Sequence, residues 1–134
     1  MKKRLALLVY LGFFALMTSC VPLLVAGGAG LGAGGAIWYK GNLETTLQAT
    51  IIETRSATLK TLKDFNLPVV SEKNDNLVVI IDSEISDGTK IWIKLNSLNL
   101  STTEVNIRVG ILGDEARSNR ILEGIKGNLK LIGS

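Results

Sequence analysis

The most constraining feature of this sequence is a set of three segments whose odd positions carry the apolar side chains. These segments are residues 77–85, 90–95 and 104–111, and a period of two is typical of a β-strand with one buried face. The apolar residues at odd positions are Leu77, Val79, Ile81, Ile85, Ile91, Ile93, Leu95, Val105, Ile107, Val109 and Ile111. Residues 43–49 alternate in the same way, and residues 69–70 would add a short extra strand. The sequence therefore predicts an antiparallel sheet of about four strands with one apolar face.

The parity of these positions decides how residues 77–85 pair with residues 90–95. A two-residue loop at Asp87 and Gly88 would set odd residues opposite even ones and mix apolar with polar side chains on each face. A three-residue loop of residues 86–88 avoids this conflict if Gly88 takes a left-handed conformation. We therefore expect Ile81 to lie opposite Ile93.

The same register predicts neighbours on the polar face, namely Glu84 with Lys90, Lys94 diagonal to Asp82, and Trp92 with Arg108. Asp82 and Glu84 would lie about 7 Å apart, a separation compatible with paired-carboxylate catalysis. Ion pairs with the two lysines explain these acids without chemistry, and we favour that interpretation. Trp92 and Arg108 form the candidate interaction surface. The indole either packs over the guanidinium as a cation–π pair or contributes to a docking patch.

Two helices complete the predicted fold. Thr50 and Glu53 form a capping box, so the first helix begins near Ile51, and Asn66 and Pro68 end it. Its apolar face is expected to consist of Ile52, Leu59, Leu62 and Phe65. The closing helix begins at Asp114 and presents the apolar stripe Ile121, Leu122, Ile125 and Leu129. The predicted fold class is α+β, a two-layer sandwich in the order β-α-β-β-β-α with both helices on one face of the sheet.

The N-terminal segment has the layout of a secretory signal. Lys2, Lys3 and Arg4 precede the apolar residues 5–17. These 13 residues would span only about 20 Å as a helix, which is less than the roughly 30 Å hydrocarbon core of a bilayer. We therefore expect residues 1–19 to be a cleaved signal peptide.

The end of this segment, residues 17–20, resembles the lipobox of bacterial lipoproteins, with small residues before Cys20 and Met17 where Leu is usual. The resemblance implies cleavage before Cys20 and attachment of a diacylglyceryl group and an N-acyl chain. Such a double modification would hold the protein on a membrane. Val21, rather than Asp, after the cysteine implies the outer membrane.

A glycine-rich segment follows the cysteine and marks a boundary, so the predicted organisation is a signal peptide over residues 1–19, a lipidated Cys20 and tether over residues 20–37, and an α+β domain over residues 38–134. As a random coil, the roughly 17 residues from Val21 would reach about 20 to 25 Å. The alternative is a membrane-associated or oligomerising helix with Gly28, Gly32 and Ala36 on one face, followed by Trp38, Tyr39 and Lys40 as an interfacial anchor.

Composition argues against several classes of function. The chain has no His and one Cys, so it lacks imidazole bases and ligands and cannot form an internal disulfide. Without the three basic residues of the leader, 12 basic residues balance 12 acidic ones, and we expect no nucleic-acid partner. Asp114 and Glu115 fit a helix cap better than a metal site. We therefore expect no enzymatic activity, no metal and no cofactor.

Gly30, Gly32 and Gly35 match the spacing of the dinucleotide-binding fingerprint. The strand that must precede this fingerprint is missing, so we do not expect a nucleotide site.

The order of these features resembles a family of small uncharacterised proteobacterial lipoproteins, defined as a domain of unknown function. The resemblance rests on residues 34–43, 50–68, 107–115 and 120–129. It implies localisation to the cell envelope, and it assigns no functional residues beyond Cys20. We expect a lipid-anchored interaction or accessory module in the periplasm with an envelope protein partner. The alternatives are a carrier of an apolar small molecule held between helix and sheet, and an oligomer formed through the glycine segment.

Overall fold

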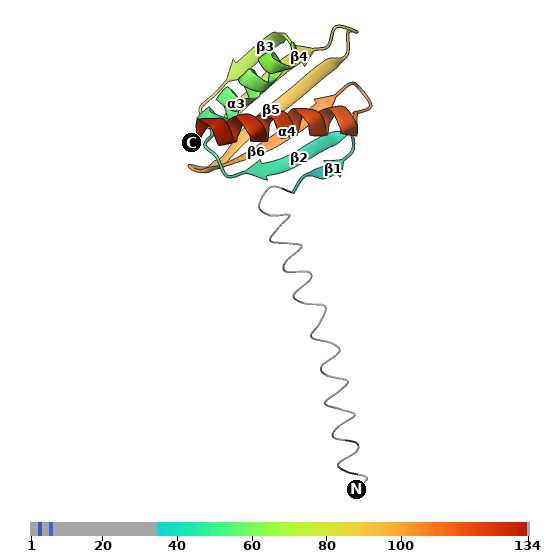
Figure 1. Cartoon of the computed structure of the whole chain (residues 1–134), viewed down its shortest axis with the longest axis vertical. Coiled ribbons are helices and arrows are strands. Elements are labelled where there is room, and N and C mark those ends of the chain that lie inside the picture. Colours follow the sequence, from blue (N-terminus) through green and yellow to red (C-terminus); the bar gives the residue numbers. More distant parts are fainter. Residues whose placement is uncertain (1–2, 4–5, 7–34, 134) are drawn as a thin grey trace. The chain divides into compact units, whose positions relative to one another are not determined.

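The structure is a computed structural model that describes residues 3, 6 and 35–133 (Figure 1). The chain divides into two compact units, Met1–Gly32 and Ala33–Ser134. All secondary structure considered below belongs to the second unit. Cys20 and the glycine-rich residues up to 34 lie outside the described residues, so the predictions for the leader, the lipidation site and the tether stay predictions.

The described part of the second unit contains six strands and two helices, which are β1 (Ile37–Tyr39), β2 (Asn42–Leu47), α3 (Ile51–Asp64), β3 (Val69–Asn74), β4 (Val78–Glu84), β5 (Lys90–Asn99), β6 (Thr102–Val109) and α4 (Glu115–Ile132). The strands form one antiparallel sheet in the order β1-β2-β6-β5-β4-β3. The predicted α+β class and antiparallel sheet are confirmed. The predicted number of about four strands is wrong.

Both additional strands lie at the edges of the sheet. β1 pairs with β2 through a two-residue turn in which Lys40 and Gly41 have φ values of 48° and 83°, as a type I′ hairpin requires. This places Trp38 opposite Leu43 and packs it against the core, so Trp38 and Tyr39 are strand residues, and an interfacial role for this segment stays a prediction. β3 extends well beyond the two valines that suggested it, with an irregular register at its start. Most of its side chains are exposed, so it shows no alternation of apolar and polar residues.

The predicted register is confirmed. Ile81 lies opposite Ile93, and Leu95 lies opposite Val105. Gly88 has a φ of 86°, its N–H donates to the Ile85 carbonyl at 2.9 Å, and the Ile85 N–H donates to the Thr89 carbonyl at 2.8 Å. The requirement that one face be apolar therefore fixes the pairing of β4 and β5.

The odd-numbered side chains of the central strands form the core, and their fully buried members are Val79, Ile81, Ile91, Ile93, Leu95, Val105, Ile107 and Val109. Two residues of the predicted rows are not in it. Leu77 and Ile111 are 65% and 81% exposed, because β4 begins only at Val78 and β6 ends at Val109. Helix α3 contacts β4, β5 and β6, and α4 contacts β2 and β6. Figure 1 shows both helices in front of the sheet.

Helix α3 begins at its predicted capping box, and its predicted apolar face is correct in part, since Leu62 is buried and Leu59 and Phe65 pack against the core whereas Ile52 does not. Ile52 is 74% exposed, and the buried residues are Thr54, Ala57, Thr58, Thr61 and Leu62. Each of the three threonine hydroxyls donates to the carbonyl four residues earlier, at 2.7 to 2.8 Å. Since the hydroxyls are satisfied within the helix, the threonine methyl groups can pack like those of valine.

Helix α4 confirms the predicted stripe, with Ile121, Leu122 and Ile125 buried and Leu129 half-buried. Asp114 is its N-cap and accepts from the Arg117 N–H at 2.9 Å. The two helices meet closely, because a Cβ at Gly124 would lie 2.5 Å from the Thr61 methyl group. Asn128, which the sequence did not single out, is buried here and donates to the Thr61 hydroxyl at 2.9 Å and to Asp64 at 3.3 Å.

We predict that Gly113→Ala destabilises the fold more than Gly88→Ala. Both glycines have a positive φ, 82° and 86°, so each alanine costs about 1–2 kcal/mol of backbone strain. Nothing lies within 4 Å of a Cβ at Gly88, whereas a Cβ at Gly113 would clash with the backbone of Gly41 and add about 1–3 kcal/mol. Thermal unfolding followed by circular dichroism should give a Tm about 4–8 °C lower for Gly113→Ala than for Gly88→Ala. Equal Tm values would contradict the close approach.

Candidate interaction surface on the open face of the sheet

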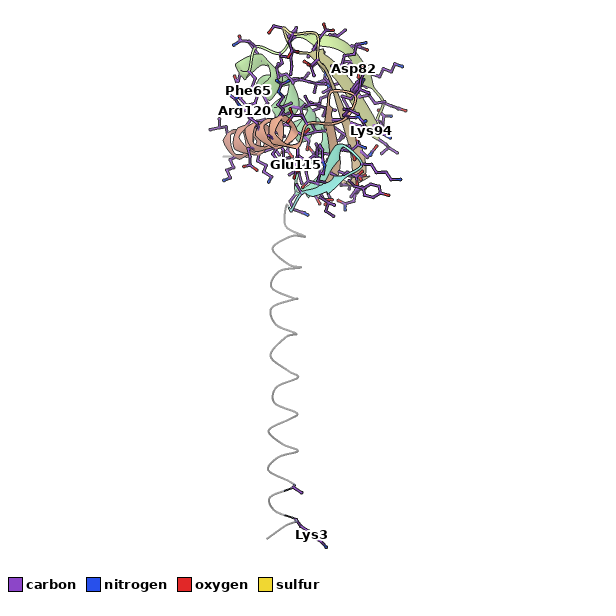
Figure 2. All side chains as sticks on the ribbon, turned by 90° about the vertical axis from the view of Figure 1, so that its right-hand side faces the viewer. Lys3, Phe65, Asp82, Lys94, Glu115 and Arg120 are labelled. Atoms are coloured by element: carbon purple, nitrogen blue, oxygen red, sulfur yellow. The ribbon has the colours of Figure 1, made fainter. Side chains whose placement is uncertain are left out.

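The even-numbered side chains of the central strands point away from the core and form what we call the open face. Trp92 lies near its centre, half-buried, with Asp82 on one side and Arg108 on the other in the strand register. Figure 2 shows Asp82 and Lys94 on the side of the sheet away from α4, whereas Phe65 and Arg120 lie on the helix side. The predicted surface residues Trp92 and Arg108 are therefore neighbours on one face.

Two hollows flank Trp92, and both are open to solvent. The end hollow, of about 830 Å³, lies between the β4–β5 turn and the β6–α4 loop, and its lining includes Lys90, Trp92 and Leu112. The face hollow, of about 430 Å³, lies over the middle of the sheet, and its lining includes Ile80, Trp92 and Arg108. The indole is shared by both hollows and would contact a ligand in either of them.

The predicted cation–π contact between Trp92 and Arg108 is not formed. Within residues 35–133 the cation–π pairs are Lys40 over Tyr39 at 5.2 Å and Arg120 over Phe65 at 5.4 Å. The Arg108 guanidinium instead donates to the Lys40 carbonyl at 3.2 Å and to the Ile111 carbonyl. Carbonyls left unpaired at the two neighbouring turns attract the guanidinium more strongly than the indole face does. Among residues 35–133 no guanidinium covers the indole, and the docking-patch alternative stays a prediction.

The charged side chains of the open face are not paired as predicted. Glu84 lies opposite Lys90, and Asp82 lies two residues along β4 from the register partner of Lys94, but none of these four forms an ion pair within the described part of the chain. Solvated lysines and carboxylates gain little from pairing and lose side-chain freedom, which explains the separation. The face therefore presents separate positive and negative groups to solvent.

At the end of the sheet, ion pairs connect the turns. Arg117 lies 3.7 Å from Asp87 in the β4–β5 turn and 3.4 Å from Asp114 at the start of α4. The Thr89 hydroxyl and N–H, which donate to Asp87, lower the pKa of that carboxyl, and Arg117 adds to the effect. The β4–β5 turn is thereby fixed against the helix and keeps one wall of the end hollow in place.

A third hollow, of about 400 Å³, opens between the end of α3 and the sheet. Its apolar lining includes Phe65, Leu67 and Ile85, and Arg117 and Arg120 stand beside them. Sequence patterning did not identify it, because its lining residues come from four separate elements. The apolar-ligand alternative requires a hollow between helix and sheet, and this alternative stays a prediction.

Asp114 and Glu115 belong to the start of α4, as their cap interpretation predicted. The described residues contain no group of three or more acidic or cysteine side chains placed to hold a metal ion. They also contain no helix that is both long and apolar enough to cross a membrane.

Comparison with known proteins supplies the family. A search of curated proteins gives no match. One family model, described as Protein of unknown function (DUF3568), matches residues 4–128. This confirms the expectation of a domain of unknown function, while the lipoprotein character stays a prediction. Because the match extends over most of the sequence, the chain belongs to the DUF3568 family of proteins of unknown function.

Proposed function

We propose that this protein is a lipid-anchored lipoprotein of the bacterial envelope whose α+β domain serves as a non-catalytic interaction or accessory module. The anchor is an acylated Cys20, and the location is the outer membrane with the domain in the periplasm. The contact surface is the open face around Trp92. This proposal takes the domain as a two-layer sandwich, in which the helices cover one face of the sheet and the other remains free for a partner.

The anchor is supported by the N-terminal sequence. A basic start, an apolar segment too short for a stable span, and small residues before Cys20 occur together in the order that lipidation requires. The thiol is also the only one in the chain, so an internal disulfide cannot consume it. Two or more acyl chains provide stable attachment to a membrane.

Trp92 is the single observation that carries the interaction role. An indole is enriched at protein interfaces because it offers a large apolar surface together with one N–H donor. Here it lies half-buried on a mainly polar sheet face, with no cation of the described domain over its ring, and it lines both the end hollow and the face hollow. The opposite, core-facing side chains are already packed.

We predict that the native product begins at Cys20 and carries fatty acyl mass. Intact mass spectrometry of the protein purified from membranes should show the diacylglyceryl and N-acyl additions, and Cys20→Ser should abolish both cleavage and acylation because the thiol is the acyl acceptor. A native product that still begins at Met1, or one that begins at residue 20 without acyl mass, would refute the anchor.

We predict that Trp92→Ala reduces capture of the partner from crosslinked envelopes through a tag after Ser134. Truncation of an interface hot spot costs about 2 kcal/mol or more, which corresponds to roughly thirtyfold weaker binding. Ile52→Ala, at a residue 74% exposed on α3, is the matched control and should leave capture unchanged. If Trp92→Ala keeps both its Tm and full capture, the open face is not the contact surface.

The hollow beside Phe65 favours a second candidate function, the carriage of a small apolar anion. Its apolar lining would hold a hydrocarbon or ring. Arg117 is paired with Asp87 and Asp114, and Asp64 also lines the hollow, so Arg120 is the cation that would contact a negatively charged group.

We predict for this second candidate that anilinonaphthalene sulfonate, an apolar anion, binds the folded chain with enhanced fluorescence. Arg120→Gln should weaken this binding about tenfold, because a hydrogen bond to a charged group contributes about 1.5–3 kcal/mol. Lys126→Gln, farther along α4, should not change it. Equal affinity in both variants would remove the carrier function.

A further inference from the structure

The β6–α4 loop exposes two adjacent aliphatic side chains at its tip. Ile111 and Leu112 are 81% and 91% exposed, and they lie between Gly110 and Gly113, whose φ values are 74° and 82°. The Gly113 N–H donates to the Gly110 carbonyl at 3.3 Å and closes the loop. Because the chain turns at Gly110, Ile111 leaves the buried odd-numbered row and joins Leu112 in solvent.

This loop is held against the β1–β2 turn. A Cβ at Gly41 would lie 2.8 Å from the Leu112 carbonyl oxygen, so the two backbones are in close contact. Arg108 connects the same two turns through its bonds to the Lys40 and Ile111 carbonyls. The aliphatic pair is therefore displayed by a braced loop and does not need to be ordered on binding.

Aromatic and basic side chains come from the segments next to this loop, because Tyr39 and Lys40 belong to the adjoining β1–β2 turn and Lys90 lines the end hollow together with Leu112. Tyr39 is 56% exposed, and the Lys40 ammonium lies over its ring. Within the described part of the chain, Lys40 and Lys90 form no ion pair with a carboxylate, whereas Asp87 and Asp114 share a single guanidinium, that of Arg117. Aliphatic, tyrosine and lysine side chains together are typical of proteins that contact the interfacial region of a bilayer.

We propose that this end of the domain, Tyr39, Lys40, Lys90, Ile111 and Leu112, docks on a phospholipid surface. Ile111 and Leu112 enter the boundary between headgroups and acyl chains, Tyr39 lies at headgroup level, and the two lysines contact lipid phosphates. The inference rests on the proposed anchor at Cys20. The 16 residues between Cys20 and β1 would reach about 20 to 25 Å as a coil, so the anchor would hold the domain within that distance of the bilayer.

The opposite end of the sheet provides an internal control. The β5–β6 turn also exposes leucines, with Leu100 94% exposed, but residues 97–101 carry no charged or aromatic side chain. Exposure is therefore matched at Leu112 and Leu100, and the turn that carries Leu100 supplies no basic or aromatic side chain of its own. If docking on lipid depends on the neighbouring tyrosine and lysines, the end that carries Leu112 should contact lipid more than the end that carries Leu100.

The test is photo-crosslinking of the full chain in vesicles of phosphatidylethanolamine and phosphatidylglycerol. Benzoylphenylalanine is placed at position 112 or, as the matched control, at position 100, and lipid adducts are counted by mass spectrometry. We expect about fivefold or more lipid adduct at position 112 compared with position 100. Lys40→Gln combined with Lys90→Gln should lower the yield at position 112 and leave position 100 unchanged. Equal yields at both positions, or adducts to protein instead of lipid at position 112, would overturn the proposal.

The mass of the native product separates this inference from the proposed anchor. Acylated Cys20 with equal yields at both positions would refute the docking surface and leave the anchor standing. Unacylated Cys20 would refute the anchor, and the ratio of yields from the same full chain in vesicles would still decide whether the loop contacts lipid.

Discussion

Burial of the odd-numbered face of the sheet is the interaction on which the rest of the structure depends. A shift by one residue in the pairing of β4, β5 and β6 would move isoleucines and valines into water and bring lysines and glutamates into the core. Ile81, Ile93 and Ile107 are buried almost completely, so such a shift would lose most of the hydrophobic stabilisation. The same constraint fixes which residues meet on the other side. Ile91 and Ile93 must face the core, so Trp92 faces the other side of the sheet, where its register partners are Asp82 and Arg108.

The two helices are stabilised differently from the sheet. Their buried polar side chains form hydrogen bonds within the helix pair, which allows them to be buried. The threonine hydroxyls of α3 bond back to their own helix, and Asn128 of α4 donates to Thr61 and Asp64 across the helix pair. Hydrogen bonds from Lys60 and Asn128 lower the pKa of Asp64, which keeps this acceptor ionised. None of the described buried side-chain polar atoms lacks a partner. The packing of α3 on α4 therefore selects for small side chains and specific hydrogen bonds more than for apolar area.

Sequence patterning was sufficient where one periodic signal dominated. The capping box at Thr50, the glycine bulge at Gly88 and the strand register all depend on local chemistry or parity, and each is confirmed. Predictions from sequence patterning failed where tertiary contacts, rather than hydropathy, decide which side chains are buried. Ile52 was expected inside and lies outside, because Thr54 and Thr58 turn the other side of α3 to the sheet. Three residues of β1 are too few to show a period, and the role of Arg108 depends on two carbonyls that come together only in the folded chain. The Gly-Ile-Leu-Gly sequence at residues 110–113 was the available signal for an exposed loop.

The two ends of the sheet differ in a way that stability alone does not explain. Ile111 and Leu112 bury little surface in the chain, so they contribute little hydrophobic stabilisation, yet Arg108 and the Gly41–Gly113 contact hold their loop in place. The backbone there is restricted to glycine at two positive-φ positions, a constraint that a plain connection between β6 and α4 would not need. We infer that the ordered loop serves a contact with a partner outside the chain. With an acyl anchor at Cys20, a weak contact of a few side chains with the same membrane would suffice, because the tether supplies a high effective concentration. Such a second attachment point would restrict the orientation of the domain, and it would determine whether Trp92 and the open face are turned toward a partner.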